Sequence, residues 1–169
     1  WDVRSIGHVG KKEWAHLKWR VLIPIYHFGE IVSWTTRSIS QRGPRYLSAK
    51  AEQESISHKS ILYGADYAFH SVIVHEGPID VWATGPGAVA TLGTGYTDAQ
   101  LSALTGYSRR VVCYDSSPEA QERAGRLAQE LSLYPGETFN VCLETGGDAA
   151  EAEKWELAEL RKLAGIKAG

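Results

Sequence analysis

Hydrophobic runs of strand length alternate with polar, helix-like segments in the second half of the chain. The apolar runs are rich in β-branched residues and occupy residues 71–76 (SVIVHE), 88–93 (AVATLG), 109–115 (RRVVCYD) and 139–144 (FNVCLE). Short apolar runs of this kind, bounded by turn residues, are typical of buried strands. Because helix-like segments separate them, we expect βαβ crossovers and a mostly parallel sheet flanked by helices.

Helix start signals support this division into strands and helices. Residues 97–100 (TDAQ) have the pattern of a capping box. Ser116 or Ser117 is placed to cap the long segment that follows, which runs to about residue 132. Asp148 has the position of a cap for a last helix that starts directly after it, and Gly165 has the position of its end.

The first part of the chain has a different pattern. Residues 19–40 contain two strand-like runs around the turn His27-Phe28-Gly29, which predicts a hairpin whose turn is not of the two-residue Asn-Gly type. The segment after it is polar and loop-like. We therefore predict a small α+β lobe over residues 1–70 and an α/β domain over residues 71–169.

Charge separates the same two parts. Residues 1–70 carry ten Lys/Arg against six Asp/Glu, whereas residues 71–169 carry eight against fourteen. The asymmetry can be accidental. Its functional interpretation is a basic part that faces phosphates and an acidic part that holds a cation.

Composition indicates an ordinary globular protein, with 43% hydrophobic and 22% charged residues. No apolar stretch approaches the roughly 18–20 residues that span a bilayer, so we expect no membrane association. Cys113 and Cys142 stand in apolar runs without a CxxC pair, which predicts reduced core thiols and a cytoplasmic protein. The chain begins at Trp1 and has no methionine, so we expect it to be part of a longer protein.

Four acidic residues follow the predicted strands. Glu76 ends one strand and Asp115 another, Asp80 lies about one helical turn beyond Glu76, and Asp148 follows the fourth strand. Because carboxyl ends of parallel strands share one edge of a sheet, these carboxylates can converge, and Mg²⁺ is the ion that suits them. The alternative is that Asp80, Asp115 and Asp148 are helix-capping or first-turn acids.

The order of these motifs resembles the TOPRIM domain of bacterial-type primases, topoisomerases and some nucleases. The segments that carry the resemblance are VIVHEGPIDVWA, AVATLGTGYTDAQ, RRVVCYDSSPEAQERA and ETGGDAAE. The segments RVLIPIYHFGEIVSWTTRSI, RYLSA and HKSILYGADYA are similar to the basic subdomain that precedes TOPRIM in bacterial and phage primases. The resemblance covers about residues 18 to 160 and implies a TOPRIM-type fold.

The resemblance also implies an activity and its site. It implies a primase core that makes short RNA primers on single-stranded DNA from nucleoside triphosphates, with Mg²⁺ or Mn²⁺. The implied catalytic and metal-binding residues are Glu76, Asp80, Asp115, Ser117 and Asp148. The implied contacts to nucleic acid or nucleotide are Arg20, Arg37, Arg45, Tyr46 and Lys59, whose alternative is a solvated basic surface. A replicative helicase is an implied partner through regions outside this sequence.

The segment after Asp115 departs from the family pattern, with Ala120 in place of a glycine and, more importantly, a serine in place of an acid. Ser117 stands where the family usually has a second acid, two residues after Asp115. A hydroxyl is a weaker ligand than a carboxylate, so we expect one metal site to lose affinity. Two alternatives to a working primase core therefore stay open, a TOPRIM nucleic-acid-binding module with weak catalysis and a TOPRIM phosphodiester nuclease.

Overall fold

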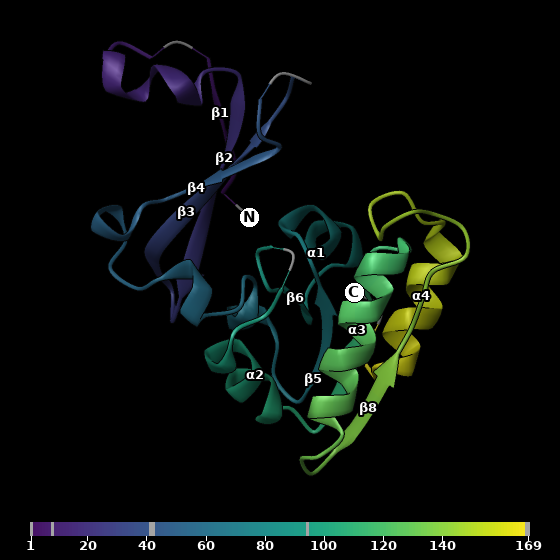
Figure 1. The fold of residues 1–169 in the computed structure, drawn as a ribbon. Helices are drawn as coiled ribbons and strands as arrows, with labels where there is room; N and C mark the ends of the chain where they lie inside the picture. Colours follow the sequence, from purple (N-terminus) through teal and green to yellow (C-terminus); the bar gives the residue numbers. More distant parts are fainter. Residues whose placement is uncertain (1, 8, 41–42, 94, 168–169) are drawn as a thin grey trace. The chain divides into compact units, whose positions relative to one another are not determined.

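The computed structural model describes residues 2–7, 9–40, 43–93 and 95–167 and divides the chain into two compact units (Figure 1). The first unit is Trp1–His58 and the second is Lys59–Gly169. This division lies nearer the N-terminus than residue 70 because the segment after His58 pairs with the second unit. The Tyr63 amide donates to the Ala90 carbonyl at 3.0 Å, and the Ala90 amide donates back to Tyr63 at the same distance.

The first unit is built on one antiparallel sheet with the order β1-β2-β3-β4. Its strands are β1 (Arg4–Ile6), β2 (Arg20–His27), β3 (Glu30–Ser38) and β4 (Tyr46–Ser48). Two short 3-10 helices accompany the sheet, η1 (Lys12–Leu17) and η2 (Ala51–Gln53). The apolar side chains of Ile23 and Ile25 on β2 are fully buried and anchor the small core of this unit.

The predicted hairpin is formed by β2 and β3, which pair from Arg20↔Ser38 to His27↔Glu30. Its turn consists of Phe28 and Gly29, both with positive φ (52° and 81°). Two-residue hairpin turns require this left-handed backbone, which Asn-Gly adopts most readily. The turn therefore has the geometry of the common two-residue type although a phenylalanine stands at its first position.

The second unit is an α/β layer structure around a parallel sheet with the order β6-β5-β7-β8. Its strands are β5 (Ser71–His75), β6 (Ala88–Ala90), β7 (Arg109–Val112) and β8 (Glu137–Asn140). Its helices are α1 (Pro78–Thr84), α2 (Asp98–Thr105), α3 (Pro118–Leu131) and α4 (Lys154–Leu163). Before the sheet lie η3 (His58–Ser60), which begins at the last residue of the first unit, and η4 (Ala65–Tyr67). None of the described helices has the length and apolar character needed to cross a membrane.

The two faces of this sheet are covered by different helices. Val72, Val74 and Val112 pack with apolar residues of α2 and α3 in one buried cluster. The alternate position, Ile73, is also fully buried and faces the side where α1 and α4 lie. Burial on both faces explains why the strands are nearly all apolar rather than alternating.

The predicted helix starts are confirmed for α2 and α3 and wrong for α4. The Thr97 hydroxyl accepts from the Gln100 amide at the start of α2, as the capping box predicts. By contrast, α4 begins at Lys154, and Asp148 instead closes a turn by accepting from the Glu151 amide at 3.0 Å. Asp80, from outside the turn, also binds its backbone by accepting from the Ala150 amide at 3.4 Å.

The fourth strand is shorter than predicted. It ends at Asn140, so Cys142 lies beyond the sheet and is exposed, while Cys113 is buried as expected. Both cysteines are free thiols. The prediction of a core thiol at Cys142 is therefore wrong, because the apolar run that contains it leaves the sheet two residues earlier.

Candidate functional site

The strand order places two acidic residues at the point where the sheet's connections diverge. The chain leaves β5 through α1 toward β6 on one side, and leaves β7 through α3 toward β8 on the other. The carboxyl ends of β5 and β7 are adjacent, and such a switch point is where α/β sheets bind ligands. Glu76 directly follows β5, and Asp115 follows β7 after Cys113 and Tyr114, with the Cys113 amide still donating to Val74 at 2.9 Å.

Glu76 is mostly buried at this edge and has a cationic neighbour. Its side chain is 15% exposed, and Arg123 Nη2 from α3 lies 3.2 Å from Oε1 and 3.4 Å from Oε2. Burial raises the pKa of Glu76, and the negative charge of Asp115 raises it further, while the bond to Arg123 lowers it in part. Asp115 is therefore close enough to act on Glu76.

Asp80 lies in the first turn of α1 and is only 7% exposed. Burial raises its pKa to about 7, and the charges of Asp148 and Asp115 contribute to that rise. The Ala150 amide donates to Asp80 Oδ1 at 3.4 Å, and this hydrogen bond opposes the rise of the pKa in part. The charges of Asp148 and Asp115 thus add to the cost of ionising the buried Asp80, and a bound cation would relieve that repulsion.

Backbone contacts bring the loop after β7 to the loop that carries Asp148. The Ser116 amide donates to the Gly147 carbonyl at 2.8 Å. From α3, Gln121 Nε2 donates to the carbonyls of Tyr114 and Asp115 at 3.2 and 2.9 Å, which fixes the path of the chain there. The structure thus brings Glu76, Asp80, Asp115 and Asp148 to one edge of one sheet.

Ser117 has a structural task in the same loop. Its Oγ accepts from the Ala120 amide at 3.3 Å, so Ser117 is the N-cap of α3. Ser is among the favoured residues for this position because its side chain satisfies an amide that the helix leaves free. As a metal ligand it would offer only a neutral oxygen that is already engaged.

The donor set suits a hard divalent cation. Within the part of the chain that the structure describes, no group of three or more His, Cys, Asp or Glu side chains is arranged so that it could hold a metal ion by itself. Mg²⁺ does not require one, because it is commonly held by one or two carboxylates, with water and substrate phosphates completing its shell. Glu76 and Asp115 supply such a pair at the sheet edge, where burial and the neighbouring negative charges both raise the pKa of Asp80.

Lys59 belongs to the second unit and lies at the carboxyl end of β6. Its Nζ donates to the Leu92 carbonyl at 2.7 Å, and burial lowers its pKa. Gly93 leaves the space that this ammonium occupies, since a Cβ there would stand 2.6 Å from Lys59 Nζ. Lys59 therefore holds the loop after β6 and presents a cation at the same end of the sheet as Glu76.

Arg37, Arg45 and Tyr46 lie together in the first unit. Arg37 Nη1 donates to the Tyr46 hydroxyl at 2.7 Å, and its guanidinium carbon is 5.4 Å from the centre of the Tyr46 ring. Arg37 and Arg45 line an open pocket of about 350 Å³ together with the hydroxyl-bearing Ser38 and Ser40. Two guanidinium groups beside hydroxyl groups are suited to bind a phosphate.

Arg20 has a structural role instead. It is 4% exposed, and Nε donates to Thr36 Oγ1 at 2.7 Å while Nη2 donates to the carbonyls of Pro44 and Arg45 at 2.9 and 3.1 Å. These bonds hold the segment that leads into β4. Burial lowers its pKa, and its donors are committed to the protein. We therefore remove Arg20 from the set predicted to contact nucleic acid.

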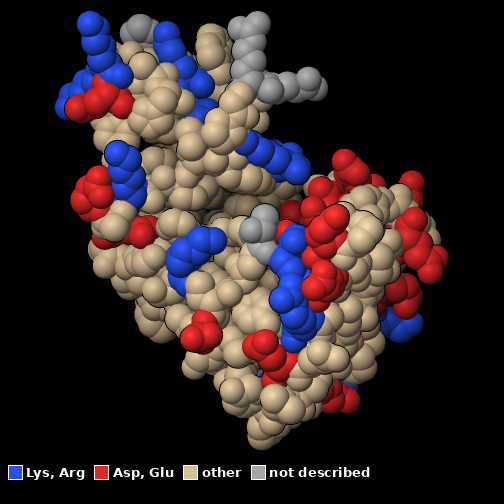
Figure 2. Space-filling view, in the orientation of Figure 1, with Lys and Arg blue, Asp and Glu red and all other residues tan. Residues whose placement is uncertain are grey.

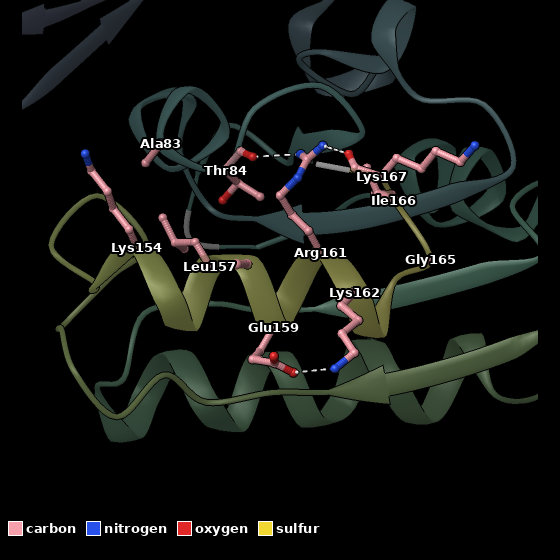
Figure 3. Close-up of a pocket in the computed structure, with 11 residues that line it drawn as sticks. Ala83, Thr84, Lys154, Leu157, Glu159, Arg161, Lys162, Gly165, Ile166 and Lys167 are labelled. Atoms are coloured by element: carbon pink, nitrogen blue, oxygen red, sulfur yellow. Dashed lines mark hydrogen bonds and ion pairs between the residues drawn. The ribbon is translucent and has the colours of Figure 1, made fainter. Parts of the chain in front are cut away.

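His75 is a buried residue beside the acidic edge whose contacts could not be predicted from the sequence. His75 Nδ1 lies 2.8 Å from the Cys113 carbonyl and Nε2 lies 2.8 Å from Thr84 Oγ1, so the ring joins the ends of β7 and α1. Burial lowers its pKa to about 4, which keeps the ring neutral. Arg161 supports the same helix end from α4 by donating to the Thr84 carbonyl at 2.8 Å (Figure 3).

Figure 3 also shows the cavity beside Arg161, which has a volume of about 740 Å³. It is lined by the end of α1 and by α4, and Glu76 is not among its lining residues. A second cavity, of about 630 Å³, adjoins it and includes the Gly85–Gly87 turn that precedes β6. Both therefore lie toward the amino ends of the strands, away from the acidic edge.

Comparison with known proteins gives the class of this fold. Residues 73–152 match the Toprim-like family. This match lies within the second unit, and the predicted TOPRIM-type α/β fold is confirmed.

The particular relatives are primases, and the likeness covers both units. The DNA primase of Campylobacter jejuni is 29% identical over an alignment of 171 residues, gaps included. The alignment covers 89% of this chain and 27% of that protein. The zinc-binding and RNA polymerase domains of Aquifex aeolicus primase superpose with a TM-score of 0.74 at 23% identity, covering 88% of this chain and 40% of that one. A DnaG primase catalytic domain bound to single-stranded DNA gives a TM-score of 0.72 at 23% identity, with 86% and 51% covered.

These matches identify the chain as having the fold of a TOPRIM primase core, as the sequence resemblance implied. The chain spans about a quarter of the length of the curated relative it matches and about half or less of the two solved chains.

Proposed function

We propose that this chain is the catalytic part of a primase and makes short RNA primers on single-stranded DNA by metal-dependent nucleotidyl transfer. The single observation that carries the proposal is the gathering of Glu76, Asp80, Asp115 and Asp148 at the switch point of a Toprim-like sheet. The raised pKa values of Glu76 and Asp80, which follow from burial and from the neighbouring carboxylates, favour a place that receives positive charge. The likeness to primases, which extends over the first unit as well, favours primer synthesis over phosphodiester cleavage.

In this reaction the 3′-hydroxyl of a growing strand attacks the α-phosphorus of a nucleoside triphosphate. A new P–O bond forms, the bond between the α-phosphorus and the β-phosphate oxygen breaks, the hydroxyl loses its proton and pyrophosphate leaves. Glu76 and Asp115 would hold Mg²⁺ or Mn²⁺, with Asp80 and Asp148 nearby. A bound divalent cation supplies Lewis-acid activation of the hydroxyl and neutralises charge on the phosphates.

The protein's remaining contribution is to bind and orient phosphates. In the first unit, Arg37 and Arg45 line the open pocket of about 350 Å³, and the Tyr46 hydroxyl holds the guanidinium of Arg37 in place. In the second unit, Lys59 offers an ammonium at the carboxyl end of the sheet. We assign these three cations to the template backbone or the triphosphate, in a cytoplasmic enzyme of DNA replication.

The role of Ser117 supports a second candidate function. Because Ser117 caps α3 and replaces an acid, the chain could bind nucleic acid through the same surfaces while turning over weakly. Binding to single-stranded DNA that persists in chelator, without nucleotide addition under any condition, would identify that function.

Extension of a short RNA annealed to a single-stranded DNA template tests the main proposal, because it needs no separate initiation module. Labelled product should appear with Mg²⁺ or Mn²⁺ and disappear in chelator, and a comparison of ribonucleotides with deoxyribonucleotides gives the sugar preference. Glu76→Gln should abolish addition, whereas Glu119→Gln, an exposed acid on α3, should not. Equal activity of Glu76→Gln and the unaltered chain would overturn the proposed site.

A further inference from the structure

Helix α3 places a cation directly against the acidic edge. Arg123 reaches Glu76 from the second turn of α3, and both side chains are largely withdrawn from water, at 24% and 15% exposed. Figure 2 shows positive and negative side chains side by side along this helix. Arg126, three residues further on, forms an ordinary surface pair with Glu122 at 3.4 Å, with both side chains more than 60% exposed. The two arginines therefore differ in what they contact and how far they are buried.

The contact between Arg123 and Glu76 occupies the oxygens that a metal would use. A single guanidinium nitrogen, Nη2, lies within 3.4 Å of both carboxylate oxygens. A divalent cation bound by Glu76 coordinates the same carboxylate oxygens and repels the guanidinium charge. The ion pair and a metal bound at Glu76 therefore compete.

The geometry of the pair also shows that it is held loosely. Two parallel N–H···O bonds are the strong arrangement for arginine and a carboxylate, and here one nitrogen serves both oxygens. Arg123 Nε is buried and has no hydrogen-bond partner. A buried donor without a partner costs free energy, which is regained when the side chain moves into water. A divalent cation can therefore displace the Arg123 side chain from Glu76 at a low cost in free energy.

We infer that Arg123 is a tethered counter-ion that competes with the divalent metal for Glu76. In the metal-free chain it neutralises Glu76 and limits the repulsion between Glu76 and Asp115. Metal binding then includes the release of Arg123, which lowers the apparent affinity. Together with Ser117 in place of an acid, this contact reduces both the charge and the number of free ligands at the site. The inference rests on the proposed role of Glu76 as a metal ligand.

Metal affinity measured without turnover tests this inference. Mn²⁺ binding is followed through the electron paramagnetic resonance signal of the free ion, in the unaltered chain and in Arg123→Ala, Arg126→Ala and Glu76→Gln. Arg123→Ala should tighten Mn²⁺ binding about tenfold, the factor expected when a competing charge-assisted hydrogen bond is removed. Arg126→Ala, the matched control from the same helix, should leave the affinity within about twofold, as expected of an exposed pair.

The outcomes separate this inference from the proposed function. Unchanged or weaker Mn²⁺ binding in Arg123→Ala, with binding still lost in Glu76→Gln, overturns the competition and leaves the metal site standing. An equal gain in Arg126→Ala also overturns it, because the effect is then one of general surface charge. If Glu76→Gln binds Mn²⁺ as tightly as the unaltered chain, the metal role of Glu76 itself is overturned. If Arg123→Ala does not fold, Arg123→Gln, which keeps most of the side chain's length, is measured in its place and carries the same expectations.

Discussion

Replacing Asp80 with asparagine should stabilise the metal-free chain above pH 7 and leave its stability near pH 4 almost unchanged. An asparagine has the shape of a protonated aspartate and can still accept from the Ala150 amide through Oδ1. It cannot ionise, so it removes the cost of burying a negative charge and of placing that charge beside Asp148 and Asp115. The substitution therefore measures the total cost of ionising Asp80 at the acidic edge.

The sign and size follow from the pKa of Asp80, which is raised from its ordinary value of 3.8 to about 7. Below pH 3.8 the carboxyl is protonated in the folded and the unfolded chain, so its ionisation does not affect the free energy of unfolding. Between about pH 4 and 7 the unfolded chain releases the proton and the folded chain retains it, so the folded state loses stability as the pH rises. The full loss is about 4 kcal/mol, at about 1.4 kcal/mol for each pKa unit.

Urea unfolding from pH 4 to 8, followed by tryptophan fluorescence in chelator, measures this difference. The free energy of unfolding of Asp80→Asn minus that of the unaltered chain should rise across this range by up to about 4 kcal/mol. Saturating Mg²⁺ should restore much of the loss to the unaltered chain and little to the variant. Asp98→Asn, an exposed acid of α2, is the control and should show no such rise. Parallel curves for Asp80→Asn and the unaltered chain would refute the electrostatic reasoning.

Three further substitutions test separate parts of the molecule. Ser117→Asp should tighten Mn²⁺ binding about tenfold without loss of stability at neutral pH, because aspartate is an equally good N-cap; unchanged affinity in a titration would count against Ser117 as part of the site. Arg37→Ala should weaken binding to single-stranded DNA and reduce the slope of log affinity against log salt by about 0.7, whereas Arg4→Ala should not; equal slopes would exclude a phosphate contact. Thr84→Val should lower the unfolding free energy by about 1–3 kcal/mol because it leaves His75 Nε2 without its partner, and a loss below about 0.5 kcal/mol would contradict that.

Local sequence signals identified the elements whose causes are local. The β-branched runs gave the four parallel strands, and the 97–100 capping box and Ser117 gave the starts of α2 and α3. The predicted start of the last helix was wrong because Asp148 and Glu151 satisfy a cap pattern equally well in an isolated turn. That turn is held by Asp80, which lies almost 70 residues away in the sequence.

The candidate site was predictable to the extent that it depends on strand ends. Glu76 and Asp115 follow adjacent strands, and a parallel sheet brings such positions together whatever the details of packing. Arg123 and His75 could not be found in this way, because the contact of Arg123 with Glu76 and that of His75 with Thr84 are set by the approach of a helix to the sheet. Arg20 shows the reverse error, since an arginine in a basic segment gives no sign that its guanidinium is buried under backbone carbonyls.

Paramagnetic broadening of amide signals tests most directly whether the acidic edge receives the metal. Mn²⁺ added below stoichiometry to the ¹⁵N-labelled chain should first broaden residues 76–80 and 115–117 at the carboxyl ends of β5 and β7. Signals of Gly87 and Arg109, at the amino ends of the strands, should stay sharp, and Glu76→Gln should remove the selective effect. Broadening centred on the exposed acids of α3 or α4, with residues 76–80 unaffected, would contradict a metal site at the switch point of this sheet.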